Sequence, residues 1–310
     1  MSLVYNGILS ANARQVDTQY RDLVRRTWDQ GIISKSGMSQ PARRLTFQTM
    51  KFDLSNGFPI VTERDLVSLS RKTNRSYMTQ AFGEITAFLN GARWLHELEH
   101  FGCHWWKPWA TEAKAKKRGL EVGDLGPGSY GPIWTAFPTE DGGSFNQVDF
   151  VVEQIAFRPE LKTHVLTTWH PPSNFRTSSR NQKALVSPCH GNLTIHVYPD
   201  HGFFDMTHDQ RSADVLVGLP ANLAAYSAFM LMLASVTGYK ARVLNYLIRD
   251  AHIYEVQYPY VERILATSEA RPATLSLLNS KDRMQDYRNT DFAIDDYDPQ
   301  DDRYRIPTPV

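Results

Sequence analysis

Two cysteines are the side chains of this 310-residue sequence best suited to covalent chemistry, and each is followed directly by a histidine. A cysteine attacks as its thiolate, and the free thiol has a pKa of about 8.5, so nearby positive charge decides its reactivity. Cys103 lies among tryptophans in "FGCHWWKPW", an apolar setting that favours the neutral thiol. Cys189, in "LVSPCHGNLTIHV", follows a segment that contains Arg176, Arg180 and Lys183. Cys189 is therefore the better candidate nucleophile, although a free cysteine is more often a small buried hydrophobic residue.

The Arg211-Ser212 pair in "DQRSADVLVG" is a second candidate feature. A guanidinium binds two phosphate oxygens and a hydroxyl binds a third, so this pair suits a phosphate ligand. If the fold returns Arg211 to Cys189, one guanidinium both holds phosphate and stabilises a thiolate. A surface ion pair is the alternative for Arg211. His190 is not by itself a base for Cys189, because neighbouring side chains on a strand point to opposite faces.

Composition limits the class of protein. With 42% hydrophobic and 22% charged residues, the chain is apolar enough and long enough for a globular core. A net charge of +1 gives no bulk attraction to nucleic acid or to a membrane, so we expect neither as a partner. Two cysteines exclude a disulfide framework and favour a reducing compartment. The N-terminus lacks the pattern of a signal peptide, and we expect a cytoplasmic protein.

The hydrophobic pattern predicts an α+β fold in a single domain over residues 1–310, with helices and strands segregated along the chain. Helical periodicity covers residues 14–31, 83–91, 94–102 and 219–237. Alternation predicts strands over residues 44–54, 162–170, 191–199, 202–208 and 241–256. Residues 107–132 are polar and glycine-rich and are predicted to be mostly loop. The apolar run over 215–238 has the length of a membrane span, but Pro220, Asn222 and its small polar residues favour a buried core helix.

A long basic segment occupies residues 170–187, between Trp169 and Cys189. Two interpretations stay open at this point. The segment is either a solvated loop or a basic flap that closes over an anionic ligand.

Several motifs follow one another along the chain: "FDLSNGFPIVTERDL", "GEITAFLNG", "WWKPWA", "DLGPGSYGPIW", "SPCHG", "DQRSADVLVGLPANLAAY", "RDAHIY" and "DYRNTDFAIDDYDP". Their order, from about residue 50 to the C-terminus, resembles the thymidylate synthase family. The resemblance implies a large mixed sheet flanked by helices and a homodimer packed sheet to sheet. It also implies chemistry on a pyrimidine nucleoside monophosphate, with 5,10-methylenetetrahydrofolate as the carbon donor and no metal.

The resemblance assigns roles to individual residues of this chain. A thiolate that adds to C6 of uracil turns the ring into an enolate, which attacks carbon through C5. The catalytic group implied by the family comprises Cys189, Glu84, Tyr130, His190, Asn222 and Arg211. The nucleotide would be bound by Arg211, Ser212, Gln210, Asn222, His252 and Tyr254. The folate-binding wall would comprise Trp106, Trp109, Asp214, Gly218 and Ala221. Asn222 offers one donor and one acceptor, which suits O4 and N3–H of uracil.

Several positions depart from the family pattern. The phosphate loop near the N-terminus is replaced by "SKSGMSQPARRLTF", in which Lys35, Arg43 or Arg44 are candidate substitutes. A pair of arginines before one strand is replaced by Lys162 and Thr163, and a glycine before "DAHIY" is replaced by Arg249. The aromatic residue before the base-reading asparagine is replaced by Ala221, which enlarges the folate side. The segment "ERDLVSLSRKTNRSYMTQAF" is longer than is usual.

These departures keep more than one function open. Reductive methylation of dUMP to dTMP is the leading interpretation. If water instead of hydride reaches the exocyclic methylene on C5, the product is a hydroxymethyl nucleotide made from dUMP, dCMP or CMP. A non-catalytic nucleotide-binding relative would not need the Cys189 thiolate, and a cysteine hydrolase would need a base aimed at it.

Overall fold

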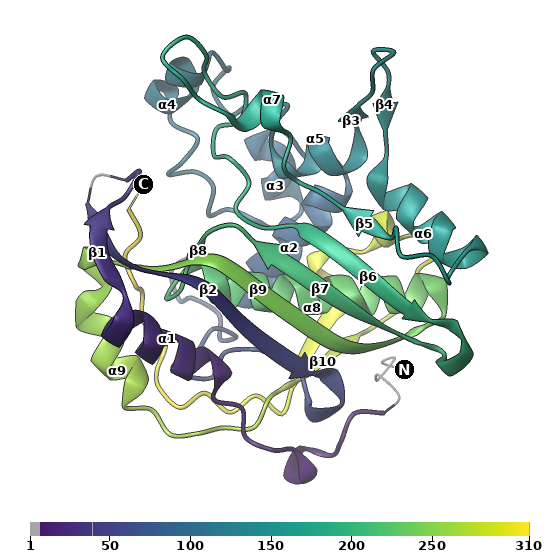
Figure 1. Ribbon diagram of the computed structural model, residues 1–310. Helices are drawn as coiled ribbons and strands as arrows, with labels where there is room; N and C mark the ends of the chain where they lie inside the picture. The colour runs from purple at the N-terminus through teal and green to yellow at the C-terminus, as the bar shows by residue number, and fades with distance from the viewer. Residues whose placement is uncertain (1–6, 39, 310) are drawn as a thin grey trace.

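A mixed sheet of seven strands forms the centre of the computed structural model, which describes residues 7–38 and 40–309 (Figure 1). Its order is β1-β2-β9-β7-β6-β5, and the short β8 pairs with β9. Strands β7 and β8 run parallel to β9, and the other neighbours are antiparallel. The strands of this sheet are β1 (Ile32–Lys35), β2 (Pro41–Asp53), β5 (Val165–Leu166), β6 (Asn192–Tyr198), β7 (Phe203–Gln210), β8 (Ala213–Asp214) and β9 (Lys240–Tyr254). This sheet confirms the predicted α+β fold.

Helices cover one face and the margins of the sheet. They are α1 (Gln19–Gln30), α2 (Tyr77–Leu89), α3 (Leu95–His100), α4 (Glu112–Arg118), α5 (Tyr130–Thr135), α6 (Gln147–Phe157), α7 (Pro171–Asn174), α8 (Gly218–Thr237) and α9 (Val261–Leu265). Two small antiparallel pairs join β3 (Phe137–Pro138) with β4 (Ser144–Phe145) and β10 (Thr274–Leu277) with β11 (Phe292–Asp295). In Figure 1, α8 and α2 lie behind the sheet, and no described helix crosses the front of β9, β7 and β6.

Helix α8 is the centre of the hydrophobic core and packs on α2 and β9. It is apolar on all sides, as is expected of a helix surrounded by protein. By length and composition it passes for a membrane span, but 83% of the qualifying window is buried inside the molecule. The prediction of a buried core helix is therefore confirmed. The helix ends at Gly238, whose φ of 78° is the left-handed conformation that glycine adopts readily.

Some predicted boundaries are wrong. Helix α1 starts at Gln19 rather than at residue 14, and α2 starts at Tyr77, where the Ser76 side chain caps it by accepting from Thr79 N. The segment predicted to be mostly loop contains α4, which is flanked by a Thr111 cap and by Gly119 at φ 66°. These caps are the signal for α4, because only Ala115 of its residues is buried.

The strand predicted over residues 162–170 contains only β5. Side chains replace the strand ladder beyond Leu166, since Thr167 N donates to Gln147 Oε1 at 2.9 Å and Thr168 N donates to Asn192 Oδ1 at 3.0 Å. Pro171 then begins α7.

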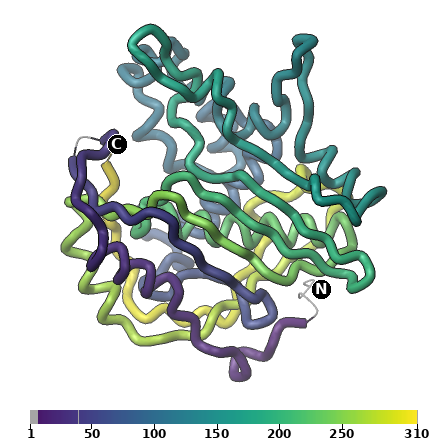
Figure 2. Tube along the Cα trace, in the orientation of Figure 1, coloured from purple at the N-terminus to yellow at the C-terminus, as the bar shows by residue number. Residues whose placement is uncertain are grey.

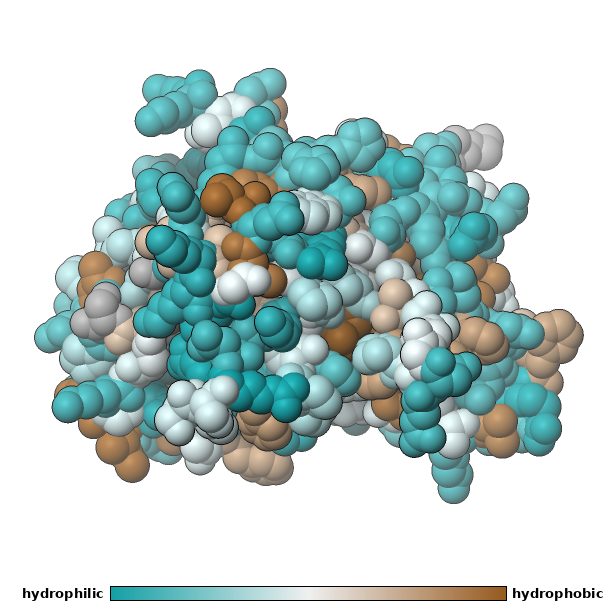
Figure 3. All heavy atoms as spheres, turned by 90° about the horizontal axis from the view of Figure 1, so that it is seen from above, coloured by the Kyte–Doolittle hydropathy of each residue, from teal (hydrophilic) through white to brown (hydrophobic). Residues whose placement is uncertain are grey.

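The basic segment over residues 170–187 is tied down at its second half. Lys183 N donates to Ser173 O at 2.6 Å, and Leu185 N donates to Leu125 O at 2.8 Å. Arg176 and Arg180 are exposed, and Arg176 acts electrostatically on Arg118 at the end of α4. Seen from above, this end of the molecule is mainly hydrophilic, with scattered hydrophobic patches (Figure 3).

The C-terminal segment, yellow in Figure 2, returns to the sheet beside β8. Thr308 Oγ1 donates to Asp214 Oδ2 at 2.8 Å, and Gln257 Nε2 donates to Pro307 O at 3.1 Å. The end of the chain thus reaches the neighbourhood of the residues predicted to bind ligands.

Candidate active site

Cys189 and Arg211 are in direct contact. The chain turns after β7, so Arg211 lies beside the residue that precedes β6, and Arg211 Nη2 is 3.4 Å from Cys189 Sγ. The same guanidinium donates to Pro188 O and Ser187 O, and it lies 5.3 Å from the ring centroid of Trp169. The structure therefore places the cation where the sequence argument required it.

Burial and charge act in opposite directions on the Cys189 thiol. Burial raises the pKa of Cys189, and the Arg211 guanidinium partly offsets this rise by stabilising the thiolate. Cys103 has no such cation, and burial together with the nearby Glu84 carboxyl raises its pKa well above the usual range. Of the two cysteines, Cys189 is the one with a guanidinium beside its thiol.

Two aromatic side chains enclose the other side of Cys189. Tyr130 Oη accepts a hydrogen bond from Cys189 N at 2.8 Å, and the Tyr130 ring lies 4.5 Å from that of His190. His190 Nδ1 is 2.7 Å from Tyr226 Oη. Burial lowers the pKa of His190 to about 3, so this imidazole is neutral at physiological pH.

Glu84 is a buried carboxyl held by two indoles. Its Oε1 accepts from Trp105 Nε1 at 2.8 Å and from Trp106 Nε1 at 2.6 Å. Burial raises the pKa of Glu84 to about 7, against the opposing effect of these hydrogen bonds. A carboxyl with this pKa exchanges protons near neutral pH, as general acid–base catalysis requires. Trp105 was not predicted as a site residue, although the "WW" dipeptide was its signal.

Asn222 lies in the first turns of α8 and receives a hydrogen bond from another predicted residue. Gln210 Nε2 donates to Asn222 Oδ1 at 3.0 Å. On β9, His252 and Tyr254 are two residues apart and have ring centroids 4.8 Å apart. This end of β9 lies beside β8, where Asp214 pairs with His252.

The comparison with protein families agrees with this geometry. A family model described as Thymidylate synthase matches residues 18–307. The chain belongs to the thymidylate synthase family. The family carries out folate-dependent modification at C5 of pyrimidine nucleotides, so this chain is a transferase of that general type.

The predicted folate wall of this thymidylate synthase family member is only partly open to a ligand. Asp214 Oδ1 accepts from Leu216 N and Val217 N, and its Oδ2 accepts from Gln257 and Thr308. Both oxygens thus already hold the start of α8 and the C-terminal segment in place. Trp106 and Ala221 are buried, whereas Trp109 is half-buried. A methyl group at Gly218 would make ordinary contacts of 3.8 Å, so packing does not require glycine there.

The candidate substitutes for the family's phosphate contacts have different positions. Arg44 pairs with Asp250 at 2.8 Å and acts electrostatically on Tyr254, so it lies at the site. Arg43 instead lies 4.6 Å from the ring centroid of Trp28. Lys35 and Lys162 are both exposed. Arg44 is therefore the candidate that pairs in register with a predicted nucleotide-binding residue, His252.

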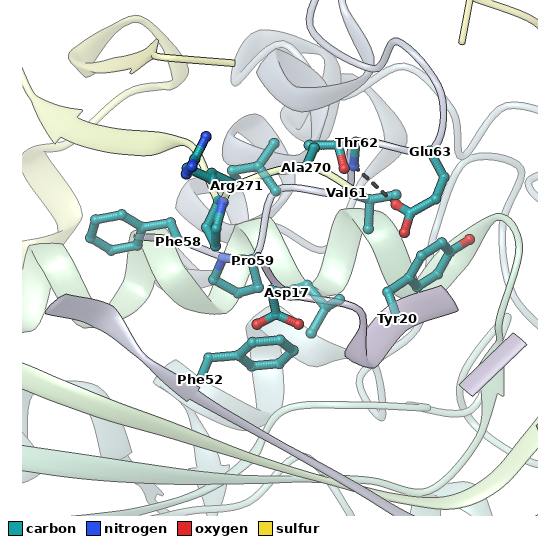
Figure 4. Close-up of a pocket in the computed structure, with 13 residues that line it drawn as sticks. Asp17, Tyr20, Phe52, Phe58, Pro59, Val61, Thr62, Glu63, Ala270 and Arg271 are labelled. Atoms are coloured by element: carbon teal, nitrogen blue, oxygen red, sulfur yellow. Dashed lines mark hydrogen bonds between the residues drawn. The ribbon is translucent and has the colours of Figure 1, made fainter. Parts of the chain in front are cut away.

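A small cavity elsewhere in the molecule is not the site. Its polar lining residues are Asp17, Tyr20, Thr62, Glu63 and Arg271, the others are apolar, and none of them is a predicted site residue (Figure 4). Its volume of about 30 Å³ matches a water molecule rather than a nucleotide. Within residues 7–38 and 40–309, no cluster of His, Cys, Asp and Glu is arranged to hold a metal ion.

Proposed function

We propose that this chain catalyses the reductive methylation of dUMP to dTMP with 5,10-methylenetetrahydrofolate. The contact between Arg211 Nη2 and Cys189 Sγ carries the proposal, because it stabilises a thiolate in an otherwise buried position. In the first step the Cys189 thiolate forms a bond to C6 of uracil. The electron pair of the C5–C6 double bond moves toward the C4 carbonyl, which makes C5 nucleophilic.

The surrounding side chains serve this step. Arg211 and Ser212 hold the phosphate, and Asn222 meets O4 and N3–H of the base. Glu84, with a pKa of about 7, moves protons near C4 and C5 through ordered water. Tyr130, whose hydroxyl accepts from Cys189 N, assists removal of the C5 proton. His190 stays neutral and belongs to the same water network.

The folate supplies the carbon unit and then the hydride that completes the methyl group. Lys114 Nζ lies over the half-buried indole of Trp109, 4.6 Å from the ring centroid, so an aromatic ring and a cation lie together at this position. The residues present therefore fit a flat, negatively charged ligand.

Hydroxymethylation of dUMP, dCMP or CMP is the alternative, and Ala221 is the observation that favours it. A methyl side chain at this buried position leaves more room beside the folate than an aromatic ring would. Water access to C5 would then compete with hydride transfer. If an Ala221→Phe variant gave the same product ratio as the parent, position 221 would have no part in deciding between the methyl and the hydroxymethyl product. A non-catalytic nucleotide-binding relative is the weaker alternative.

The product mass tests the proposal. The protein is incubated with 5,10-methylenetetrahydrofolate and, separately, with dUMP, dCMP and CMP, and dihydrofolate is followed by absorbance. Methylated dUMP with an equal amount of dihydrofolate supports the proposal. A hydroxymethyl nucleotide without dihydrofolate supports the alternative, and no product from any substrate supports the non-catalytic relative.

The assembly and location of the enzyme are part of the proposal. We infer a homodimer that packs through the front face of β9, β7 and β6, and a cytoplasmic location. The open face of the sheet supports the first inference and the two free cysteines support the second.

A further inference from the structure

A buried chain of hydrogen bonds leads from Asn222 to Tyr246 on β9. Gln210 Nε2 donates to both Asn222 Oδ1 and Ser212 O, each at 3.0 Å. Gln210 Oε1 accepts from Tyr246 Oη at 2.5 Å. Gln210 and Tyr246 are each only 1% exposed, so water does not compete for these groups.

The backbone carbonyl of Ser212 fixes the direction of every bond in this chain. A carbonyl oxygen only accepts, so the nitrogen end of the Gln210 amide must face Ser212. The second hydrogen of the same nitrogen then points to Asn222, which must present its oxygen. The two ends of an amide are assigned by such a network. Here Ser212 O shows which end of the Gln210 amide is the nitrogen, and Ser212 O and Tyr246 Oη together hold the side chain in place.

Tyr246 holds Gln210 in that orientation. Its hydroxyl satisfies Gln210 Oε1, which would otherwise be a buried acceptor without a partner. The Tyr246 ring is in turn held by His208 on β7, whose ring centroid lies 4.4 Å away. His208 Nε2 accepts from Gly191 N at 3.0 Å, and this bond fixes the His208 ring beside the Cys189 loop.

The orientation of Asn222 matters because two classes of pyrimidine present opposite patterns. A 4-oxo base has an acceptor at position 4 and a donor at N3, and a 4-amino base has the reverse. An asparagine free to rotate its amide by half a turn serves either base. An asparagine with a fixed amide matches only one of them in a given pose.

We propose that Tyr246 is a positioning residue that, through Gln210, locks the Asn222 amide and makes the site selective for 4-oxo over 4-amino pyrimidine nucleotides. The inference rests on the proposed function, in which Asn222 meets the base. Tyr246 itself touches neither the base nor the reacting atoms in this role.

The test compares Tyr246→Phe with Tyr287→Phe. Tyr287 is also fully buried and donates through its hydroxyl to Ser235 Oγ at 2.9 Å, so its variant controls for loss of a buried hydroxyl. The dissociation constants of dUMP and dCMP are measured by calorimetry without folate, together with kcat/KM for both. We expect the dUMP preference to fall about tenfold in Tyr246→Phe, the equivalent of one buried hydrogen bond, and to stay unchanged in Tyr287→Phe. A folded Tyr246→Phe protein with the parent's preference overturns the inference.

Two further measurements keep the result decisive. If Tyr246→Phe does not fold, Gln210→Met removes the same link with a side chain of similar length, and an unchanged preference in it also overturns the inference. Equal dissociation constants of dUMP and dCMP in the parent protein would also overturn the inference. If the parent binds dUMP selectively but turns over no nucleotide, the proposed function fails while the positioning role stands.

Discussion

At the scale of single residues, the reactivity of Cys189 is a balance between burial and one guanidinium. Burial raises the pKa of the thiol, and Arg211 at 3.4 Å works against this rise. Removing the positive charge leaves only the Tyr130 hydrogen bond to oppose burial, so the thiolate fraction falls at every pH below the new pKa.

Arg211→Gln should therefore slow alkylation of Cys189. We expect the labelling rate with iodoacetamide at pH 8 to fall about tenfold, which corresponds to one further pKa unit, and the pH profile to shift upward. Mass spectrometry of the labelled peptide between pH 7 and 10 gives the profile. Cys103→Ser should label like the parent, because Cys103 is buried and held as the neutral thiol. An Arg211→Gln profile that overlays the parent's would show that the contact does not control the thiol.

Glu84 links stability to pH with a defined sign. Its pKa is 4.5 when unperturbed and about 7 in the folded protein, so between these values the folded state binds a proton that the unfolded state has lost. This contribution to stability is fully present below pH 4.5 and is lost as the pH rises through 7.

The variant Glu84→Gln should remove this dependence, since an amide oxygen still accepts from both indoles. We expect the difference in the free energy of unfolding, variant minus parent, to increase by up to about 3 kcal/mol between pH 4 and pH 8. Urea titrations at both pH values measure the difference. Glu63, whose pKa is raised to about 6, also makes stability depend on pH. Its contribution is the same in both proteins and cancels in the difference between them. A constant difference between the two proteins would mean that Glu84 ionises normally.

The sequence predicted individual side chains better than it predicted their partners. Residue type and motif order singled out Cys189 and Arg211, whose contact the fold then produced. Trp105 and Tyr246 were not predicted, because their roles depend on their hydrogen-bond partners, Glu84 and Gln210. Tyr246 meets Gln210 only through the register of β7 against β9, which no local pattern reveals.

At the scale of elements, the loop before β6 depends on Gly191. Its φ of 94° is unfavourable for other residues, and an added Cβ would lie 2.6 Å from Thr168 Cγ2 and 3.0 Å from Tyr226 Oη. The surrounding side chains are buried, so they have little room to yield.

Gly191→Ala should accordingly destabilise the protein and displace the Cys189 loop. We expect a loss of about 2–4 kcal/mol in the free energy of unfolding, seen as a lower midpoint in urea. Gly37→Ala is the control, since a Cβ there meets no atom within 4 Å and the backbone is not in the left-handed region. Equal midpoints for the two variants would contradict this account of the loop.

The elements that the sequence predicted well are those with a clear hydrophobic pattern. Helix α8 and strand β9 lie in the core and show it along their whole length. Helix α4 buries only Ala115, so it has almost no apolar stripe and was recognisable by its caps alone. Strand β5 was overestimated because Thr167 and Thr168 have strand-like character but bond to side chains.

At the scale of the whole molecule, strands β9, β7 and β2 have paired charges and one strongly exposed aromatic side chain. Arg249 pairs with Asp209, and Arg242 pairs with Asp205 at 2.5 Å, across β9 and β7. Phe47 on β2 is 71% exposed. No described helix crosses the front of β9, β7 and β6, and this is the face that we propose a second copy of the chain covers.

A homodimer through this face predicts a solution mass of about twice the 35.4 kDa chain in sedimentation equilibrium. Arg249→Glu should weaken the dimer, because it replaces an ion pair with two neighbouring carboxylates, at positions 249 and 209. The twofold axis places the same two carboxylates on the partner's side of the interface. We expect the dissociation constant of the dimer to rise at least tenfold, with turnover falling in parallel as monomer accumulates. Arg263→Glu on α9, outside β9, β7 and β6, breaks the pair with Asp301 and should leave the mass unchanged. A parent protein that sediments as an active monomer would show that the open face serves no dimer and that one chain contains the complete site.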